Sequence, residues 1–178
     1  MNRFASLLAF GGLLIWAASA LCNDVAAAEA QSSPFTDARC AFSADYPGGM
    51  PAPAIKNTTE ATTADITGPG YRISYACIAS ANAPIPLLEG HALYDRLTSI
   101  AGSLGVSGAK VTTPVSPAAS CGLIEAPAAA GRSGKTRTQF CYGPLGYLIV
   151  ETASDGSPAA EQAVSAVLAS IAARPANS

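Results

Sequence analysis

Residues 71–78, with the sequence YRISYACI, show the clearest strand pattern in the chain. Apolar and polar or small residues alternate there, as expected for a strand with one buried face. The side chains placed on that face are Tyr71, Ile73, Tyr75 and Cys77. Because Gly68-Pro69-Gly70 just before is a turn signal, the stretch predicts a strand in a half-buried sheet.

Further strands are expected on both sides of this one. The same alternation places Cys40, Phe42, Ala44 and Tyr46 on one face of a strand over residues 39–46. A weaker strand is expected at 61–67, and prolines at 114 and 117 close a short strand at 111–115, which places it at a sheet edge. Residues 121–126 and 135–142 surround a turn centred on Gly131 and predict a hairpin, and a last strand follows at 147–152.

Two segments show the helical period of about 3.6 residues instead. The first begins at Gly90 and ends before Gly105, with its apolar stripe formed by Leu93, Leu97, Ile100 and Leu104, and with Asp95, Arg96 and Ser99 off that stripe. The second begins at Ser157-Pro158, an N-cap followed by proline at the first helical position. Its stripe consists of Val164, Val167, Leu168 and Ile171.

These elements predict an α+β fold: an antiparallel sheet of about six or seven strands with two helices packed on it. Short turns join the consecutive strands, which favours antiparallel pairing. We expect a single α+β domain over residues 39–174, preceded by a flexible segment at 31–38 and followed by a tail at 175–178.

Residues 1–30 have the three zones of a signal peptide. Arg3 is followed by an apolar run over residues 4–21, and Ala28-Glu29-Ala30 predicts cleavage before Gln31. Three alternatives stay open: an uncleaved membrane anchor, cleavage at Ala20, and a lipoprotein anchored through Cys22, although Leu21 is not the small residue expected before a lipidated cysteine. The predicted location is periplasmic or secreted, with no stable membrane span after cleavage.

Cleavage before Gln31 removes one of the five cysteines and leaves Cys40, Cys77, Cys121 and Cys141. An even number of cysteines in an exported chain predicts disulfides. Of the three connectivities we favour Cys40–Cys77 and Cys121–Cys141, because the hairpin brings the second pair opposite each other and the first pair lies on apolar strand faces. The close C-x-x-C pairs typical of zinc or redox sites are absent from the sequence.

Composition excludes several classes of function. The 178 residues are 49% apolar and only 12% charged, and their net charge of −2 offers no positive surplus for binding nucleic acid. The single histidine, His91, cannot by itself form a histidine-rich metal centre or a proton-shuttling pair. We therefore predict no metal ligand and no cofactor.

Candidate functional residues are few. A serine hydrolase would have only His91 as its base, and no G-x-S-x-G motif presents a nucleophile. No spacing singles out a pair of carboxylates for acid–base chemistry, but Glu125 and Glu151 flank the predicted hairpin strands and could approach one another in the sheet. Arg132, Lys135 and Arg137 form the only local basic cluster, on and beside a turn, and are a candidate partner-binding site.

One family resemblance rests on the order of the elements and on one turn. The first strand ends in Phe42-Ser43-Ala44-Asp45-Tyr46-Pro47-Gly48, and Pro51 follows soon after. With the later tyrosine-rich strand, the helices and the antiparallel strands, residues 40–173 resemble the PsbP-like α/β/α sandwich of exported bacterial proteins, although four cysteines depart from that pattern. The resemblance implies a non-catalytic accessory or binding role and transfers no functional residue.

The sequence thus favours an exported, non-catalytic binding or accessory domain of the bacterial envelope or periplasm, and no catalytic residue is assigned. Its expected partner is an envelope or secreted protein, contacted through the hairpin loops and through five tyrosines: Tyr46, Tyr71, Tyr75, Tyr142 and Tyr147. The alternative is a small secreted hydrolase with an unrecognised site.

Overall fold

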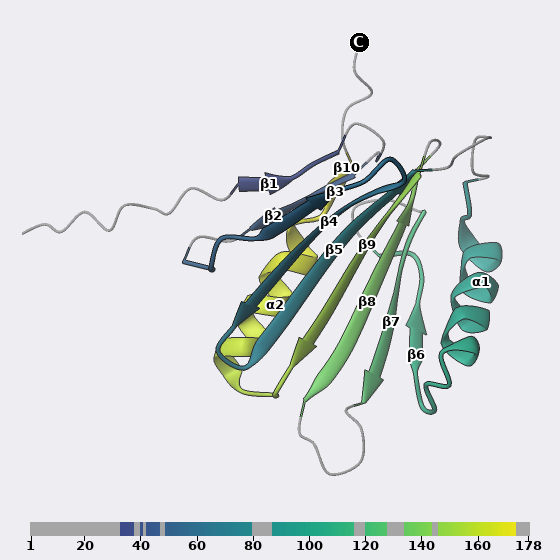
Figure 1. Cartoon of the computed structure of the whole chain (residues 1–178). Coiled ribbons are helices and arrows are strands. Elements are labelled where there is room, and N and C mark those ends of the chain that lie inside the picture. Colours follow the sequence, from purple (N-terminus) through teal and green to yellow (C-terminus); the bar gives the residue numbers. More distant parts are fainter. Residues whose placement is uncertain are drawn as a thin grey trace, which may run out of the picture.

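The computed structural model describes residues 33–37, 40, 42–46, 49–79, 87–115, 120–127, 134–143 and 146–173 (Figure 1). The elements in chain order are β1 (Ser33–Phe35), β2 (Phe42–Tyr46), β3 (Ala54–Asn57), β4 (Ala61–Gly68), β5 (Tyr71–Ala79), α1 (Gly90–Ser103), β6 (Lys110–Thr112), β7 (Cys121–Pro127), β8 (Lys135–Tyr142), β9 (Gly146–Ser154), α2 (Pro158–Ser170) and β10 (Ala172–Ala173).

Seven of these strands form one antiparallel sheet in the order β3-β4-β5-β9-β8-β7-β6. The two-residue turn Pro69-Gly70 joins β4 to β5, with Gly70 at φ +76°, a conformation that glycine adopts without strain. In β5 the buried residues Ile73, Tyr75 and Cys77 alternate with partly exposed ones, as the sequence predicts. The α+β fold with a sheet of seven strands and two helices is therefore confirmed.

The two helices lie on opposite faces of this sheet (Figure 1). Along β9, Leu148 and Val150 pack into the core cluster that includes Val167 of α2. The side chains between them point to the other face, where Tyr147 and Ile149 pack against the cluster that includes Leu93 and Leu97 of α1. The sheet thus separates two hydrophobic cores.

A second, three-stranded sheet with the order β1-β2-β10 packs on the α2 face. Phe35 of β1 is 3% exposed and its ring lies 5.3 Å from that of Tyr75 on β5. Within the segment expected to be flexible at 31–38, residues 33–35 form β1, and the apolar ring of Phe35 is buried where β1 pairs with β2.

Both disulfides connect the cysteines in the predicted pairs. Cys121 and Cys141 lie directly opposite each other in the β7–β8 ladder, with their Cα atoms 4.1 Å apart. Cys40 and Cys77 have Cα atoms 6.0 Å apart. Cys77 lies in β5 of the large sheet and Cys40 lies two residues before β2, so this bond links the segment that leads into the small sheet to the large sheet.

The remaining differences concern the ends of elements and two additional strands, β3 and the two-residue β10 that follows α2. Leu104, expected on the apolar stripe of α1, is 66% exposed because the helix ends at Ser103 and Gly105 turns the chain at φ +65°. Ala101 is buried in its place. Strand β3 was not predicted, because all four of its residues are exposed at a sheet edge and show no alternation. The short strand expected at a sheet edge is β6, which lies at the edge opposite β3.

Candidate functional site

The face of the sheet that carries α1 is covered only in part. The helix packs on β6 and β7 at one end of the sheet, and the strands from β8 to β3 extend beyond it (Figure 1). A cavity of about 280 Å³ lies between α1 and the sheet, and we call it the α1 cleft. The described residues that line it are Leu88, Arg96, Ile100, Phe140, Tyr142, Tyr147 and Ile149.

The β-ladders bring these residues together from distant parts of the sequence. Phe140 of β8 pairs with Ile149 of β9, and Tyr142 pairs with Tyr147 in the neighbouring row. The rings of the two tyrosines are 5.8 Å apart. Four apolar or aromatic side chains of adjacent strands therefore form the floor of the α1 cleft.

Gly122 determines how closely α1 approaches β7. A Cβ atom on this residue would lie 2.3 Å from Cδ1 of Leu97, which is fully buried, and 2.7 Å from Cγ2 of Thr113. A residue with a side chain would therefore push the helix away from the sheet. Gly122 on β7 pairs with Phe140 on β8, which is part of the cleft floor. The contact that sets the distance between α1 and the sheet therefore lies on the strand next to that floor.

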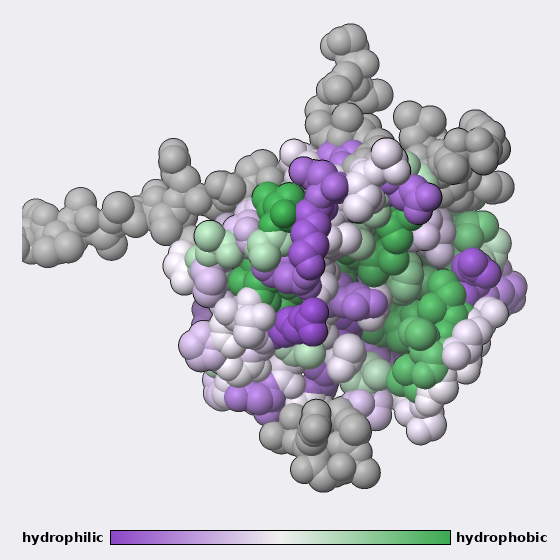
Figure 2. Space-filling view, viewed as in Figure 1, coloured by the Kyte–Doolittle hydropathy of each residue, from purple (hydrophilic) through white to green (hydrophobic). Residues whose placement is uncertain are grey.

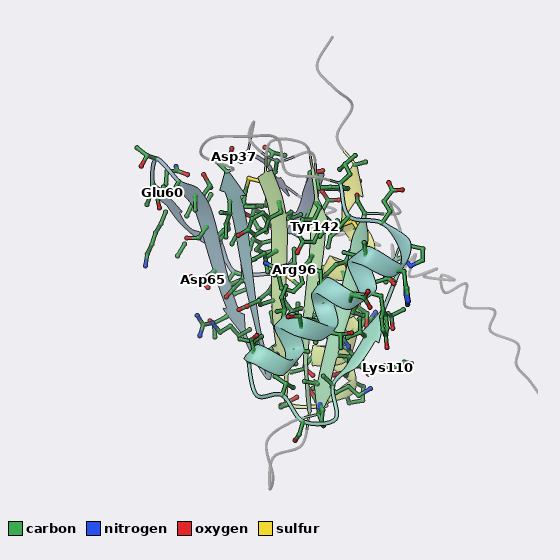
Figure 3. The ribbon with its side chains drawn as sticks, turned by 90° about the vertical axis from the view of Figure 1, so that its right-hand side faces the viewer. Asp37, Glu60, Asp65, Arg96, Lys110 and Tyr142 are labelled. Atoms are coloured by element: carbon green, nitrogen blue, oxygen red, sulfur yellow. A yellow bond between two sulfur atoms is a disulfide. The ribbon has the colours of Figure 1, made fainter. Side chains whose placement is uncertain are left out.

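Arg96 is the one charged residue among the described residues that line the cleft. It lies on α1, and its guanidinium is close enough to the Tyr142 hydroxyl to act on the pKa of that group. Both residues are labelled in Figure 3. Burial raises the pKa of Tyr142, and the neighbouring Arg96 charge partly offsets this effect. The hydroxyl is thus protonated at neutral pH and stays available as a second polar group beside the cation.

The same face of the sheet becomes polar beyond the cleft. Ser74 donates a 2.5 Å hydrogen bond to Asp65, and the Arg72 guanidinium lies 3.4 Å from the same carboxylate. The Ser74 hydrogen bond lowers the pKa of Asp65, and Arg72 lowers it further. Glu151 pairs with Ser74 in the ladder. Hydrophobic surface gathers beside α1 in Figure 2. The polar part of the face carries Arg72 as well as the carboxylates of Asp65 and Glu151.

The basic cluster expected at the hairpin turn has a different environment. Arg137 is only 12% exposed, and its side chain donates hydrogen bonds of 2.9 Å to Glu125 and 2.6 Å to Glu161. Lys135 lies 3.7 Å from Glu125, and Arg132 lies outside the described residues. Because nearby carboxylates neutralise Arg137, its charge is not presented to a partner; a partner site at the turn stays a prediction.

The other candidate residues do not converge. Glu125 shares a face of the sheet with Arg137, whereas Glu151 pairs with Thr138 on the opposite face, so the two carboxylates do not form an acid pair. His91 is exposed in the first turn of α1, with its ring stacked 6.3 Å from that of Tyr94. Within the part of the chain that the structure describes, no group of three metal-ligating side chains occurs.

The five tyrosines expected at a contact surface divide into separate environments. Tyr46 and Tyr75 are buried in the core with their rings 5.1 Å apart, so the contact role expected for them is wrong. Tyr71 packs against the same core. Tyr142 and Tyr147 line the α1 cleft. Of the five tyrosines, these two therefore lie at a cavity where a ligand could contact them.

Sequence reasoning did not identify the cleft itself. Arg96 was noted only as a residue off the apolar stripe of its helix. The available signal was its position one turn before Ile100, on the side of α1 next to the buried stripe.

Comparisons with known proteins give no relative for this chain. No protein-family model matches the sequence, and neither a curated protein nor a solved structure is significantly similar to it.

Proposed function

We propose that the protein is an exported, non-catalytic binding domain of the bacterial envelope or periplasm and that the α1 cleft holds its ligand. The observation that carries this proposal is the cavity of about 280 Å³ lined by six apolar or aromatic residues and one arginine. Ligand sites are typically concave and mostly apolar, with a few polar groups that orient the ligand.

Two disulfides support the exported location. All four of their cysteines are at most 5% exposed, and such bonds persist in oxidising compartments. Across the described ranges, no helix has both the length and the apolar character needed to cross a bilayer.

The position of His91 supports a binding role over a hydrolytic one. It lies at the start of α1, outside the lining of the cleft, and its ring stacks on Tyr94. A general base must lie within hydrogen-bond reach of the group it deprotonates. His91 does not meet this condition for a substrate held in the cleft.

A neutral aromatic probe tests the proposal. We expect purified, oxidised protein to bind 2-naphthamide at one site with a dissociation constant below about 1 mM, measured by calorimetry or NMR titration. Ile149→Trp should abolish this binding, because the larger side chain would fill the cleft floor. Thr63→Trp is the matched control, since Thr63 lies in the same row of the sheet face but outside the cleft.

Unchanged binding in Ile149→Trp, or equal losses in both variants, would show that the cleft is not the binding site. A hydrolytic turnover that His91→Ala abolishes would replace the binding proposal with the enzyme alternative.

A further inference from the structure

We propose that the ligand of the α1 cleft is a small organic monoanion, a single carboxylate on a compact apolar body, and that Arg96 binds the carboxylate. This inference rests on the proposed function and adds the chemical class of the ligand. Its basis is the juxtaposition of an unpaired guanidinium, a protonated tyrosine hydroxyl and an apolar cavity.

Arg96 has no counter-charge among the described residues. It lies beside the Tyr142 hydroxyl, and no ion pair in this part of the chain includes it. Its neighbours three and four positions along α1 are Ala92, Leu93, Ser99 and Ile100, none of which carries a carboxylate. The two arginines described on the strands of the large sheet are both paired. Arg72, on the α1 face, pairs with Asp65, and Arg137, on the α2 face, pairs with two glutamates.

A guanidinium recognises a carboxylate through two parallel hydrogen bonds, which carry both energy and orientation. Arg96 meets this requirement at the wall of the cavity. The Tyr142 hydroxyl beside it is both a donor and an acceptor, so it can hydrogen-bond to the second carboxylate oxygen. The site thus matches one planar anionic group.

The surroundings limit the ligand to one negative charge. Arg96 is the only charged residue among those that line the cleft in the described part of the chain. Beyond Ile149, the next outward residue of β9 on this face is Glu151, an exposed carboxylate that would repel a second anionic group. The apolar body must therefore lie over Ile149 and Phe140, with its charged end toward α1.

The cavity also limits the size of the apolar body. A water molecule occupies about 30 Å³ in the liquid, so a cavity of about 280 Å³ holds roughly ten non-hydrogen atoms. A bicyclic aromatic body has this size, and a long acyl chain exceeds it. The tyrosine and phenylalanine rings of the floor favour stacking with a flat ligand.

A pair of isosteric ligands separates the effect of charge from that of shape. We expect 2-naphthoate to bind the oxidised protein at least about tenfold more tightly than neutral 2-naphthamide, the effect of hydrogen bonds to a charged group. Arg96→Gln should remove this difference and leave the affinity for 2-naphthamide within about twofold. Arg96→Lys should retain part of the difference, because the charge stays while the planar donor pair is lost.

Arg72→Gln is the matched control, since Arg72 is an exposed arginine on the same sheet face that is already paired with Asp65. It should leave the affinities for both ligands unchanged. Equal binding of the two ligands to the wild type, a preference that survives Arg96→Gln, or an equal loss in Arg72→Gln would overturn the carboxylate assignment. In these cases naphthamide binding and its loss in Ile149→Trp would still support the cleft, whereas the absence of binding by both ligands would overturn both proposals.

Discussion

At the scale of single residues, Arg137 connects three elements. From β8 it donates to Glu125 on β7 and to Glu161 in the first turn of α2, and Ser154 of β9 donates to the same Glu161. Its Nη1 is buried without a hydrogen-bond partner among the described residues. Arg137 therefore has a structural role in which it ties the start of α2 to the sheet.

Replacing Arg137 by Met should lower the free energy of unfolding by about 2 kcal/mol at neutral pH, because two partly buried glutamates lose their counter-charge. The loss should shrink in acid. The Arg137 hydrogen bond lowers the pKa of Glu125, and hydrogen bonds from Ser154 and Arg137 lower that of Glu161. Their contribution is complete above the unfolded pKa of about 4.3 and is lost as the pH falls below it. Urea unfolding between pH 3 and 7 measures this change.

The control for that variant is Lys135→Met, which removes a neighbouring charge that is 50% exposed. Exposed ion pairs contribute little, so we expect a change within about 0.5 kcal/mol. Equal effects of the two substitutions would show that Arg137 acts only as surface charge.

At the scale of the elements, the Cys121–Cys141 bond ties β7 to β8 across a separation of 20 residues. Replacing both cysteines by Ser should lower the free energy of unfolding by about 2 to 4 kcal/mol, mainly through the greater freedom of the unfolded chain. Thermal or urea unfolding under non-reducing conditions measures this loss. An unchanged midpoint would rule out a structural role, and peptide mapping of the wild type that finds crossed linkages would contradict the pairing itself.

The sequence predicted the strands with a buried face and the two helices because alternation and helical period reflect burial within one element. It could not predict which distant elements meet. The Cys40–Cys77 bond links the segment just before β2 to β5 of the other sheet, and no local pattern distinguishes that arrangement from strand pairing. The α1 cleft has the same origin, since it depends on how closely α1 approaches Gly122 and on which side chains of β8 and β9 lie beside it.

At the scale of the whole molecule, the proposed export predicts that the mature protein is shorter than its gene product. We expect intact-mass analysis of the protein recovered from the periplasm or the medium to show a chain that begins near Gln31, because signal peptidase cleaves after a small-x-small motif. Replacing Ala28 and Ala30 together by Leu should block this processing. A membrane-integral product of full length, or a lipid on Cys22, would show that the N-terminal segment is an anchor instead.

The pairing of β1 and β10 on the two sides of β2 has a consequence for how the domain can be attached. Two strand spacings of about 4.8 Å place the first and last strands of the described chain roughly 10 Å apart. Both belong to the sheet that packs on the α2 face (Figure 1). The residues that line the α1 cleft lie on the other face of the large sheet. Because β1 and β10 both run antiparallel to β2, the chain enters this sheet at the Tyr46 end of β2 and leaves it at the Phe42 end. A tether or a fusion partner at either end would therefore start on the α2 side of the large sheet and leave the opening of the cleft unobstructed.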